Sequence, residues 1–385
     1  MGGTLLKYKL LRITTVPMSI SLLLKGQLRF LNQYFDVVAV TSNGDEIHDI
    51  IEDEGIKVIQ VPMKREISIL HDLRSFSRLI RVFKDEKPDI VHANTPKASL
   101  LSMIVAWLIG VPIRIYTVTG LRFESEVGFK RKLLILMERI TCYFATHINA
   151  ESLGVKMLLK SEKITRKEAF IIGNGNINGI DEIFWNPKSV SELERINFRR
   201  QYNISNVDFC FLFVGRVVKD KGVNELVRAF EYFCRYNENY NLIIVGPFDM
   251  NESNIDLDVA EVMQKHPKIF LLGFQKDIRL IMASCDVLVL PSYREGFPNV
   301  LLQAGAMGLP IIVTPVNGTE ELIDSQNGII IEKFSIESIL HAFRAITNTE
   351  YLFDKAYCRN KVTTNYSQAE FYPLLYKFYR SLIND

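Results

Sequence analysis

The sequence has almost no excess of charge of either sign. Its 385 residues include 46 Lys and Arg against 44 Asp and Glu, so the formal net charge at pH 7 is only +2. Proteins that bind nucleic acids need concentrated basic charge to displace counterions from phosphates. The sequence therefore argues against nucleic acid as a partner. Hydrophobic residues make up 48% of the chain and charged residues 23%, which is typical of a folded globular protein.

Cysteine is scarce, and no two cysteines lie close together. The chain has five, an odd number. Their spacing fits no zinc site, and scattered cysteines of this kind favour a reducing compartment. We therefore expect no metal, no cofactor and a cytoplasmic protein. The cysteines are Cys142, Cys210, Cys234, Cys285 and Cys358.

Long apolar runs are also missing. The longest covers residues 98–113, which is shorter than the roughly 20 residues of a membrane-spanning helix, and it contains Gly110 and Pro112. It predicts a buried helix, a turn and the start of a strand. At the start of the chain, Lys7 and Lys9 interrupt the apolar residues, so we expect no secretory signal.

What the chain does contain is a regular alternation of short β-branched runs and helical patterns. This pattern is typical of α/β proteins with parallel sheets and crossover helices. The predicted strands are Lys9–Thr14, Asp36–Thr41, Lys57–Val61, Asp89–His92, Arg114–Val118, His147–Asn149, Ala169–Ile172, Phe209–Val214, Asn241–Val245, Ile269–Leu272, Val287–Leu290, Ile311–Thr314 and Gly328–Ile331.

A polar stretch interrupts this alternation and divides the chain. We predict a Rossmann-like domain at residues 1–185, a linker at 186–206 and a second Rossmann-like domain at 207–365. Residues 366–385 are predicted to form a helix that packs back on the first domain. In such sheets ligands bind at the carboxyl ends of the strands, so functional residues should directly follow strands.

The first candidate element is Gly215-Arg216, followed by Lys221-Gly222. A glycine directly after a strand lets the backbone approach a ligand closely. Arg offers a fork to phosphate oxygens and Lys a point charge, so the two cations suit a diphosphate. Taken alone, a solvated turn explains the element equally well.

The second candidate element runs from Pro291 to Gln303. Glu295 lies in the turn after a strand, where a carboxylate can accept hydrogen bonds from sugar hydroxyls. Pro298 and Asn299 are placed to open a helix, which would leave the N–H groups of residues 300 and 301 free to bind an anion. The alternative is a strand-turn-helix with a charged loop.

These two elements, with the later turn Gly318-Thr319-Glu320-Glu321, resemble the retaining GT-B glycosyltransferases of the glycogen-synthase-like superfamily. The chain is most similar to the family 4-like bacterial enzymes that build capsule, O-antigen or exopolysaccharide. The resemblance covers the whole chain and is most specific between residues 211 and 331. It implies two Rossmann-like domains whose parallel sheets face a central cleft, and a hexosyltransferase that uses a nucleotide sugar, most simply a UDP-sugar.

The resemblance also implies roles for single residues. Arg216 and Lys221 would bind the donor diphosphate, and Glu295 would hold hydroxyls of the transferred sugar; these three form the catalytic set. The wider nucleotide-sugar site would comprise Gly215, Arg216, Lys221, Glu295, Gly296, Phe297, Pro298, Asn299, Val300, Leu301 and Gln303.

Two positions depart from the family pattern. Gln303 stands where relatives have a glutamate that contacts the ribose; an amide can still form this hydrogen bond, so we expect weakened or retuned nucleotide binding and not its loss. Thr119 stands where many relatives have a histidine.

The acceptor is expected at loops of the first domain. His92, Asn94, Lys97 and Arg122 follow strands there, and for His92 a structural role is equally compatible with the sequence. The acceptor would be a glycan or an isoprenoid-diphosphate-linked sugar. Basic residues in two helical segments could place the domain on anionic lipid at the inner face of the plasma membrane. They are Arg74, Arg78, Arg81 and Lys84 in one, and Lys130, Arg131 and Lys132 in the other.

Two other functions remain open from the sequence. One is a GT-B sugar-nucleotide epimerase, which would need further acid and base groups. The other is a weakly active partner subunit that binds nucleotide or glycan, an idea that Gln303 and Thr119 motivate.

Overall fold

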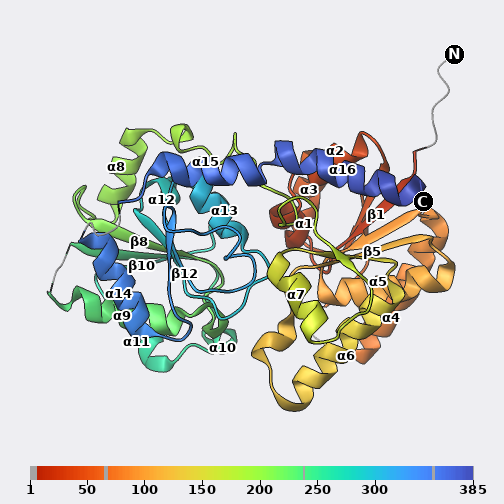
Figure 1. Ribbon diagram of the computed structural model, residues 1–385, viewed down its shortest axis with the longest axis horizontal. Coiled ribbons are helices and arrows are strands. Elements are labelled where there is room, and N and C mark those ends of the chain that lie inside the picture. Colours follow the sequence, from red (N-terminus) through yellow and green to blue (C-terminus); the bar gives the residue numbers. More distant parts are fainter. Residues whose placement is uncertain (1–6, 65–67, 237–238, 349–351, 385) are drawn as a thin grey trace. The chain divides into compact units, whose positions relative to one another are not determined.

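The computed structural model describes residues 7–64, 68–236, 239–348 and 352–384. The chain divides into two compact units (Figure 1). Unit 1 combines Met1–Asn178 with Ala369–Asp385, and unit 2 is the continuous segment Gly179–Gln368. The segment 186–206, which we predicted to be a linker, lies inside unit 2.

Unit 1 is built on a seven-stranded parallel sheet with the order β3-β2-β1-β4-β5-β6-β7. Its strands are β1 (Lys9–Ile13), β2 (Asp36–Thr41), β3 (Lys57–Gln60), β4 (Ile90–Ala93), β5 (Ile113–Val118), β6 (His147–Ala150) and β7 (Ala169–Phe170). The helices are α1 (Met18–Leu23), α2 (Gln27–Asn32), α3 (Ile47–Glu54), α4 (Ile69–Glu86), α5 (Pro96–Ile109), α6 (Gly128–Phe144), α7 (Leu153–Ser161) and α16 (Gln368–Asn384), with the 3-10 turn η1 (Arg122–Ser125).

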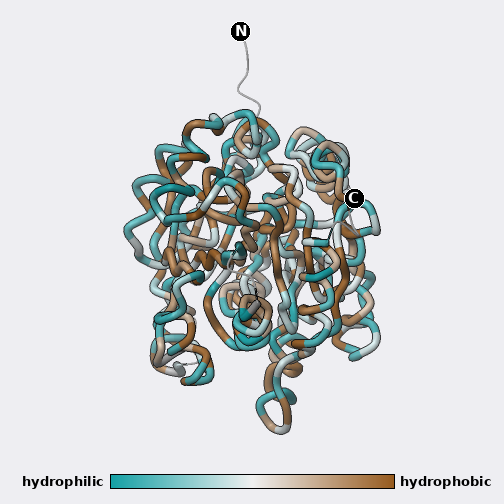
Figure 2. The backbone as a smooth tube through the Cα atoms, turned by 90° about the vertical axis from the view of Figure 1, so that its left-hand side faces the viewer, coloured by the Kyte–Doolittle hydropathy of each residue, from teal (hydrophilic) through white to brown (hydrophobic). Residues whose placement is uncertain are grey.

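Helices cover both faces of this sheet, so alternate residues of one strand enter two different cores. Leu11 and Ile13 pack in one core and Leu10 in the other. Burial on both faces explains why the strands are continuous apolar runs instead of alternating ones. Figure 2 colours the chain by hydropathy and shows apolar stretches in brown between polar stretches in teal.

The last helix, α16, completes the second of these cores. Phe371, Leu375 and Tyr379 are buried in it together with Leu10. Residues from both ends of the chain therefore build unit 1.

Unit 2 is built on a six-stranded parallel sheet with the order β10-β9-β8-β11-β12-β13. Its strands are β8 (Phe209–Val214), β9 (Tyr240–Val245), β10 (Ile269–Gly273), β11 (Val287–Leu290), β12 (Ile311–Val313) and β13 (Gly328–Ile330). The helices are α8 (Glu192–Gln201), α9 (Val223–Phe233), α10 (Met250–Ser253), α11 (Leu257–Lys265), α12 (Arg279–Ala283), α13 (Asn299–Ala306), α14 (Ile336–Thr347) and α15 (Lys355–Tyr366). The 3-10 turns are η2 (Pro187–Ser189), η3 (Lys219–Lys221) and η4 (Cys234–Tyr236).

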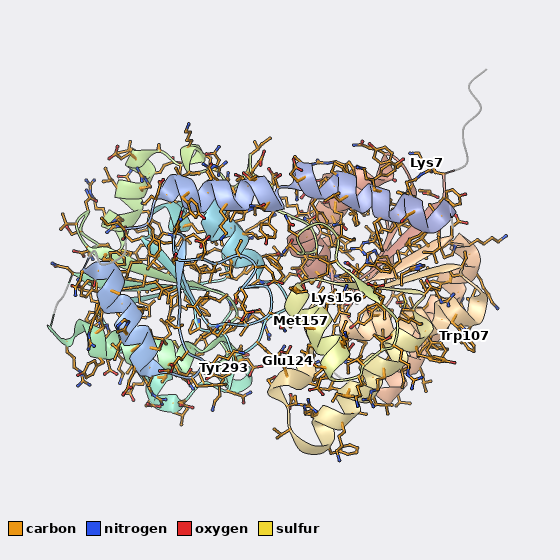
Figure 3. The ribbon with its side chains drawn as sticks, in the orientation of Figure 1. Lys7, Trp107, Glu124, Lys156, Met157 and Tyr293 are labelled. Atoms are coloured by element: carbon orange, nitrogen blue, oxygen red, sulfur yellow. The ribbon has the colours of Figure 1, made fainter. Side chains whose placement is uncertain are left out.

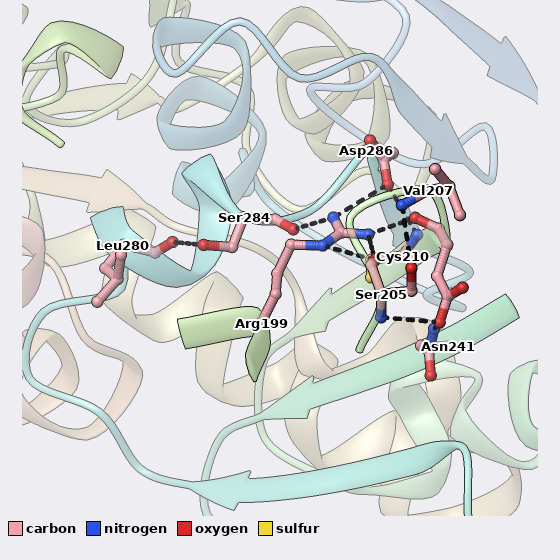
Figure 4. Close-up of polar contacts among 9 residues, drawn as sticks. Arg199, Ser205, Val207, Cys210, Asn241, Leu280, Ser284 and Asp286 are labelled. Atoms are coloured by element: carbon pink, nitrogen blue, oxygen red, sulfur yellow. Dashed lines mark hydrogen bonds and ion pairs between the residues drawn. The ribbon is translucent and has the colours of Figure 1, made fainter. Parts of the chain in front are cut away.

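Helix α8 shows why residues 186–206 are not a linker. Ser191 and Glu194 close a capping box at its start, in which each side chain bonds the backbone N–H of the other residue. Near its end, Arg199 donates to the carbonyl of Ser284 over 2.9 Å and lies 3.8 Å from the carboxylate of Asp286 (Figure 4). The helix buries only Phe198 in the core of unit 2, and hydrogen bonds of Arg199 attach it to the segment before β11, so it has no continuous apolar face that a sequence pattern would reveal.

All thirteen predicted strands are confirmed, and their ends differ from the prediction by at most two residues. The apolar stretch 98–113 forms most of α5, a turn at Gly110 and the start of β5, as expected. Within the described ranges no helix is both long and apolar enough to cross a membrane.

Candidate active site

The loops after β8 and β11 lie side by side at the carboxyl edge of the unit 2 sheet. These neighbouring strands form the point where the strand order reverses, because β9 lies beyond β8 and β12 beyond β11. Open α/β sheets bind ligands in the crevice at such a point. The structure brings two predicted site residues together there: the Nζ atom of Lys221 donates to Oε1 of Glu295. Their side chains are 21% and 11% exposed, so the pair is largely shielded from bulk water.

Gly222 explains how the two loops come so close. It has a φ of +69°, and a Cβ atom added there would lie 2.1 Å from the carbonyl oxygen of Pro291. Only glycine permits both this backbone conformation and this approach. Two further contacts join the loops: Tyr293 donates its N–H to the carbonyl of Asp220 over 2.9 Å, and Arg294 lies 3.2 Å from the Asp220 carboxylate.

The Tyr293 side chain also connects the second loop to helix α9. Its hydroxyl donates to the carboxylate of Glu225 over 2.8 Å, and Figure 3 labels its position. Asn317, in the turn after β12, also supports the loop by donating to the carbonyl of Glu295 over 3.2 Å. Neighbouring elements therefore hold the loop that carries Glu295, and the carboxylate itself contacts Lys221.

The remaining predicted cation, Arg216, lies in the loop after β8 and its side chain is exposed. Gly215 precedes it, and the backbone of Gly246 packs so closely there that a Cβ atom on Gly246 would be 1.8 Å from the Gly215 carbonyl oxygen. The glycine predicted to allow a close approach thus has a second glycine as its neighbour.

Helix α13 begins at Asn299, directly after Pro298, as predicted. The N–H of Leu301 donates to the carbonyl of Pro298 over 3.0 Å. The expectation that residues 300 and 301 both offer free N–H groups is therefore wrong for Leu301, because the first turn of the helix uses that N–H. Gln303 is partly exposed one turn after Asn299, on the same helix face.

The two residues between Glu295 and Pro298 are buried. They are Gly296 and Phe297. The ring of Phe297 packs against Tyr366, with centroids 5.4 Å apart, so this side chain belongs to the core of unit 2. Its backbone remains part of the proposed site.

On the acceptor side, His92 lies in the interior of unit 1. Its Nδ1 is 2.6 Å from the Tyr379 hydroxyl and its Nε2 is 2.6 Å from the Thr117 hydroxyl. Burial holds the pKa of the ring well below its ordinary value, so the imidazole is neutral. Both nitrogens are engaged within the protein, which corresponds to the structural role left open by the sequence.

Asn94 is fully buried, and the structure gives its side chain no hydrogen-bond partner. Lys97 pairs with Asp72 of α4 at 2.8 Å. Arg122 is exposed in η1. Lys97 and Arg122 both line a pocket of about 40 Å³. The sequence indicated the two residues but did not predict that they would share a pocket. Its lining residues are Pro96, Lys97, Arg122, Leu134, Met137, Glu138 and Thr141.

Comparison with known proteins identifies the family. Residues 194–361 match the model of the glycosyl transferases group 1, and residues 16–152 match that of the glycosyl transferase 4-like domain. The capsular polysaccharide biosynthesis glycosyltransferase CapM of Staphylococcus aureus is 36% identical over 354 residues, which cover 89% of this chain and 89% of CapM. The chain belongs to the group 1 glycosyltransferases.

A second relative by sequence and a solved structure are also similar to this glycosyltransferase. A UDP-Gal:alpha-D-GlcNAc-diphosphoundecaprenol alpha-1,3-galactosyltransferase of Escherichia coli is 29% identical, over 87% of this chain and 86% of that protein. The structure of Anabaena HepE in complex with UDP and glucose has the same fold, with a TM-score of 0.80, 18% identity and coverage of 97% of this chain and 100% of HepE. The fold is therefore GT-B, built from two Rossmann-like units with parallel sheets, as expected.

Sequence reasoning missed several residues that shape the glycosyltransferase's loops and pocket. Asp220 and Glu225 hold the loop after β11, and Glu138 lines the pocket of unit 1. Acidic residues on helices and turns are common at surfaces, so nothing local distinguishes these three.

Proposed function

We propose that this glycosyltransferase moves a hexose or an N-acetylhexosamine from a UDP-sugar to a lipid-linked or growing surface glycan, with retention of the anomeric configuration. The observation that carries the proposal is the contact between Lys221 and Glu295 at the strand-order reversal of unit 2. The names of the relatives support the substrate classes: the E. coli protein is named for UDP-Gal and a diphosphoundecaprenol-linked sugar.

The donor diphosphate would bind at Lys221 and Arg216. As the bond between the anomeric carbon and the diphosphate breaks, negative charge develops on the leaving phosphate. The Lys221 ammonium and the Arg216 guanidinium would stabilise that charge. The acceptor oxygen attacks on the same face of the sugar, and its proton passes to a leaving phosphate oxygen, so no separate base is required. The enzyme contributes positioning and charge stabilisation.

The Glu295 carboxylate would hold hydroxyls of the transferred sugar. In the ligand-free protein it pairs with Lys221, and this pairing keeps both side chains in the crevice. Donor binding would exchange this contact for two new ones, between the ammonium and the diphosphate and between the carboxylate and the sugar. No metal or cofactor takes part in the proposal, so we expect EDTA to leave turnover unchanged.

Turnover of single variants tests this assignment. The protein is incubated with a panel of nucleotide sugars and bacterial lipid extract, and glycosylated lipid is measured. We expect K221M and E295Q to lower kcat by about 10²-fold or more, the scale of a lost preorganised electrostatic contact. The matched controls K219M and E320Q change exposed residues nearby and should retain near-normal turnover. Near-normal turnover of K221M or E295Q would show that the site assignment is wrong.

We also propose that unit 1 contacts anionic lipid at the cytoplasmic face of the membrane. Phe129 and Val127 are 81% and 84% exposed at the start of α6, next to the exposed Lys132 and to Lys130, which is also exposed and pairs with Glu126 at 2.6 Å. Exposed apolar side chains flanked by cations suit a surface of anionic headgroups. Flotation with vesicles that contain anionic lipid should recover the wild-type protein, and F129S/K130S/K132S should remain unbound. Equal flotation of the two proteins, or none of the wild type, would remove this part of the proposal.

A further inference from the structure

The pocket of unit 1 lies where the sheet topology favours ligand binding. Pro96 and Lys97 begin α5 directly after β4, and Arg122 follows β5 in η1. Both strands therefore present their carboxyl ends to it. The third wall is one side of α6, which contributes Leu134, Met137 and Glu138 among others. Open α/β sheets bind ligands at this edge.

The pocket is small and mixed in character. Its volume is about 40 Å³, and one water molecule occupies about 10–15 Å³ by this measure, so it holds roughly three waters or one small functional group. Leu134, Met137 and the Pro96 ring give it apolar walls. Lys97, Arg122 and Glu138 add polar atoms.

The charges around the pocket nearly cancel. Lys97 is already paired with Asp72 at 2.8 Å, so its ammonium charge is largely compensated. Arg122 adds one positive charge at the exposed end, and Glu138 adds a carboxyl group inside. A phosphate would have to approach that carboxyl group, which disfavours an anion. A neutral polar group suits this balance better.

Glu138 is the acidic residue among those that line the pocket. It is only 7% exposed, and the Tyr116 hydroxyl donates to its Oε2 over 2.7 Å. Burial raises the pKa of this carboxyl group to about 7. A carboxylate can accept more than one hydrogen bond, and a buried one is costly unless these are made. A ligand N–H at the pocket would supply one.

We propose that this pocket is a subsite for the acetamido group of a 2-acetamido sugar in the acceptor. The amide N–H donates to Glu138, the amide carbonyl accepts from Arg122, and the methyl group packs on Leu134 and Met137. A hydroxyl group in the same place would leave the apolar walls unfilled. This inference rests on the proposed function and specifies the acceptor sugar.

Ligand-observed NMR with three soluble probes tests the proposal. The probes are N-acetylglucosamine 1-phosphate, glucose 1-phosphate and the 6-deoxy sugar rhamnose 1-phosphate. We expect the N-acetyl probe to bind about tenfold or more tightly than the other two, with the strongest saturation transfer at its acetyl methyl group. Equal binding of the first two would indicate a phosphate site, and a preference for rhamnose 1-phosphate a deoxy-sugar site; either result would overturn the proposal.

Matched variants locate the binding. L134F fills the pocket and should abolish the preference, whereas L136F changes a residue that is 52% exposed on the same helix and should retain it. R122A changes an exposed residue, so it should fold normally and reduce the preference severalfold even if L134F does not fold. If R122A and folded L134F both keep the preference for the N-acetyl probe, this pocket is not the acetamido subsite.

A UDP titration of the same samples separates the two proposals. UDP is expected to bind in unit 2, and K221M should weaken it while L134F does not. If UDP binds as expected but the acetamido preference is absent, only the subsite is wrong. If UDP does not bind, the proposed donor site itself fails.

Discussion

Gly222 is the residue on which the arrangement of the donor loops depends most directly. It lies between the turn that carries Lys221 and helix α9. Its backbone packs against the carbonyl of Pro291, at the start of the loop that carries Glu295. A side chain at this position would push the two loops apart. The site therefore depends on the lack of a side chain at residue 222 as well as on the charged side chains of Lys221 and Glu295.

We expect G222A to lower the free energy of unfolding by about 2–4 kcal/mol, because it adds a backbone clash to the strain of a left-handed conformation. It should also reduce turnover by moving Lys221 away from Glu295. Urea unfolding and product formation measure the two effects. G273A is the matched control: Gly273 has a φ of +64° in the same unit, but nothing lies within 4 Å of its added Cβ. We expect that control to cost only about 1–2 kcal/mol; equal losses for both variants would contradict the clash.

At the scale of the element, α6 takes part in two of the proposed contacts, with the membrane and with the acceptor. Its exposed start carries apolar and basic residues, and its inner face places Glu138 on the sheet beside Tyr116. Burial is the main cause of the raised pKa of Glu138, and the Tyr116 hydrogen bond partly opposes it. The Tyr116 hydroxyl and the buried Cys142 thiol lie close to this carboxyl group, and Lys97 and Arg122 line the same pocket.

This raised pKa predicts how stability depends on pH. Folding favours the protonated form of Glu138, so the stabilisation is complete below about pH 4.5 and is lost as the pH rises through about 7. Relative to E138Q, the wild type should lose about 3 kcal/mol of unfolding free energy between these two values. Urea unfolding of both proteins at several pH values measures the difference. Parallel pH profiles would show that Glu138 is not the titrating group.

At the scale of the whole molecule, the two units are built differently along the chain. Unit 2 is one continuous segment, and its core comes entirely from within it. Unit 1 needs α16 from the other end of the chain, because Phe371, Leu375 and Tyr379 fill one of its two cores.

This difference predicts the behaviour of fragments. Residues 179–368 alone should unfold cooperatively and bind UDP. Residues 1–178 alone should aggregate or remain partly unfolded, because the apolar residues under α16 would be exposed. The matched control joins residues 369–385 to residue 178 through a flexible linker and should restore cooperative unfolding. Circular dichroism during urea titration and size-exclusion chromatography measure these outcomes. A stable, monomeric 1–178 fragment would contradict the role of α16.

Local pattern was sufficient for much of the fold. The thirteen strands were predictable because strands buried on both faces need continuous apolar residues, and helices between them need a different period. The place of the two site loops could be predicted from the same strand pattern, because residues that directly follow parallel strands lie at the carboxyl edge of the sheet. Helix α8 was missed because most of its residues are polar and only Phe198 is buried, while Arg199 attaches it through hydrogen bonds to distant residues.

The sequence by itself determined the two parallel-sheet units, the loops that carry the site residues and the family of the protein. Only the tertiary structure decided which of these residues meet. His92 and Tyr379 are 287 positions apart, and Lys221 and Glu295 are 74 apart, yet each pair is in contact. Strand formation depends on the neighbours of a residue along the chain. Contacts between distant side chains depend on sheet order and on a few backbone conformations, such as that of Gly222, which no local pattern specifies.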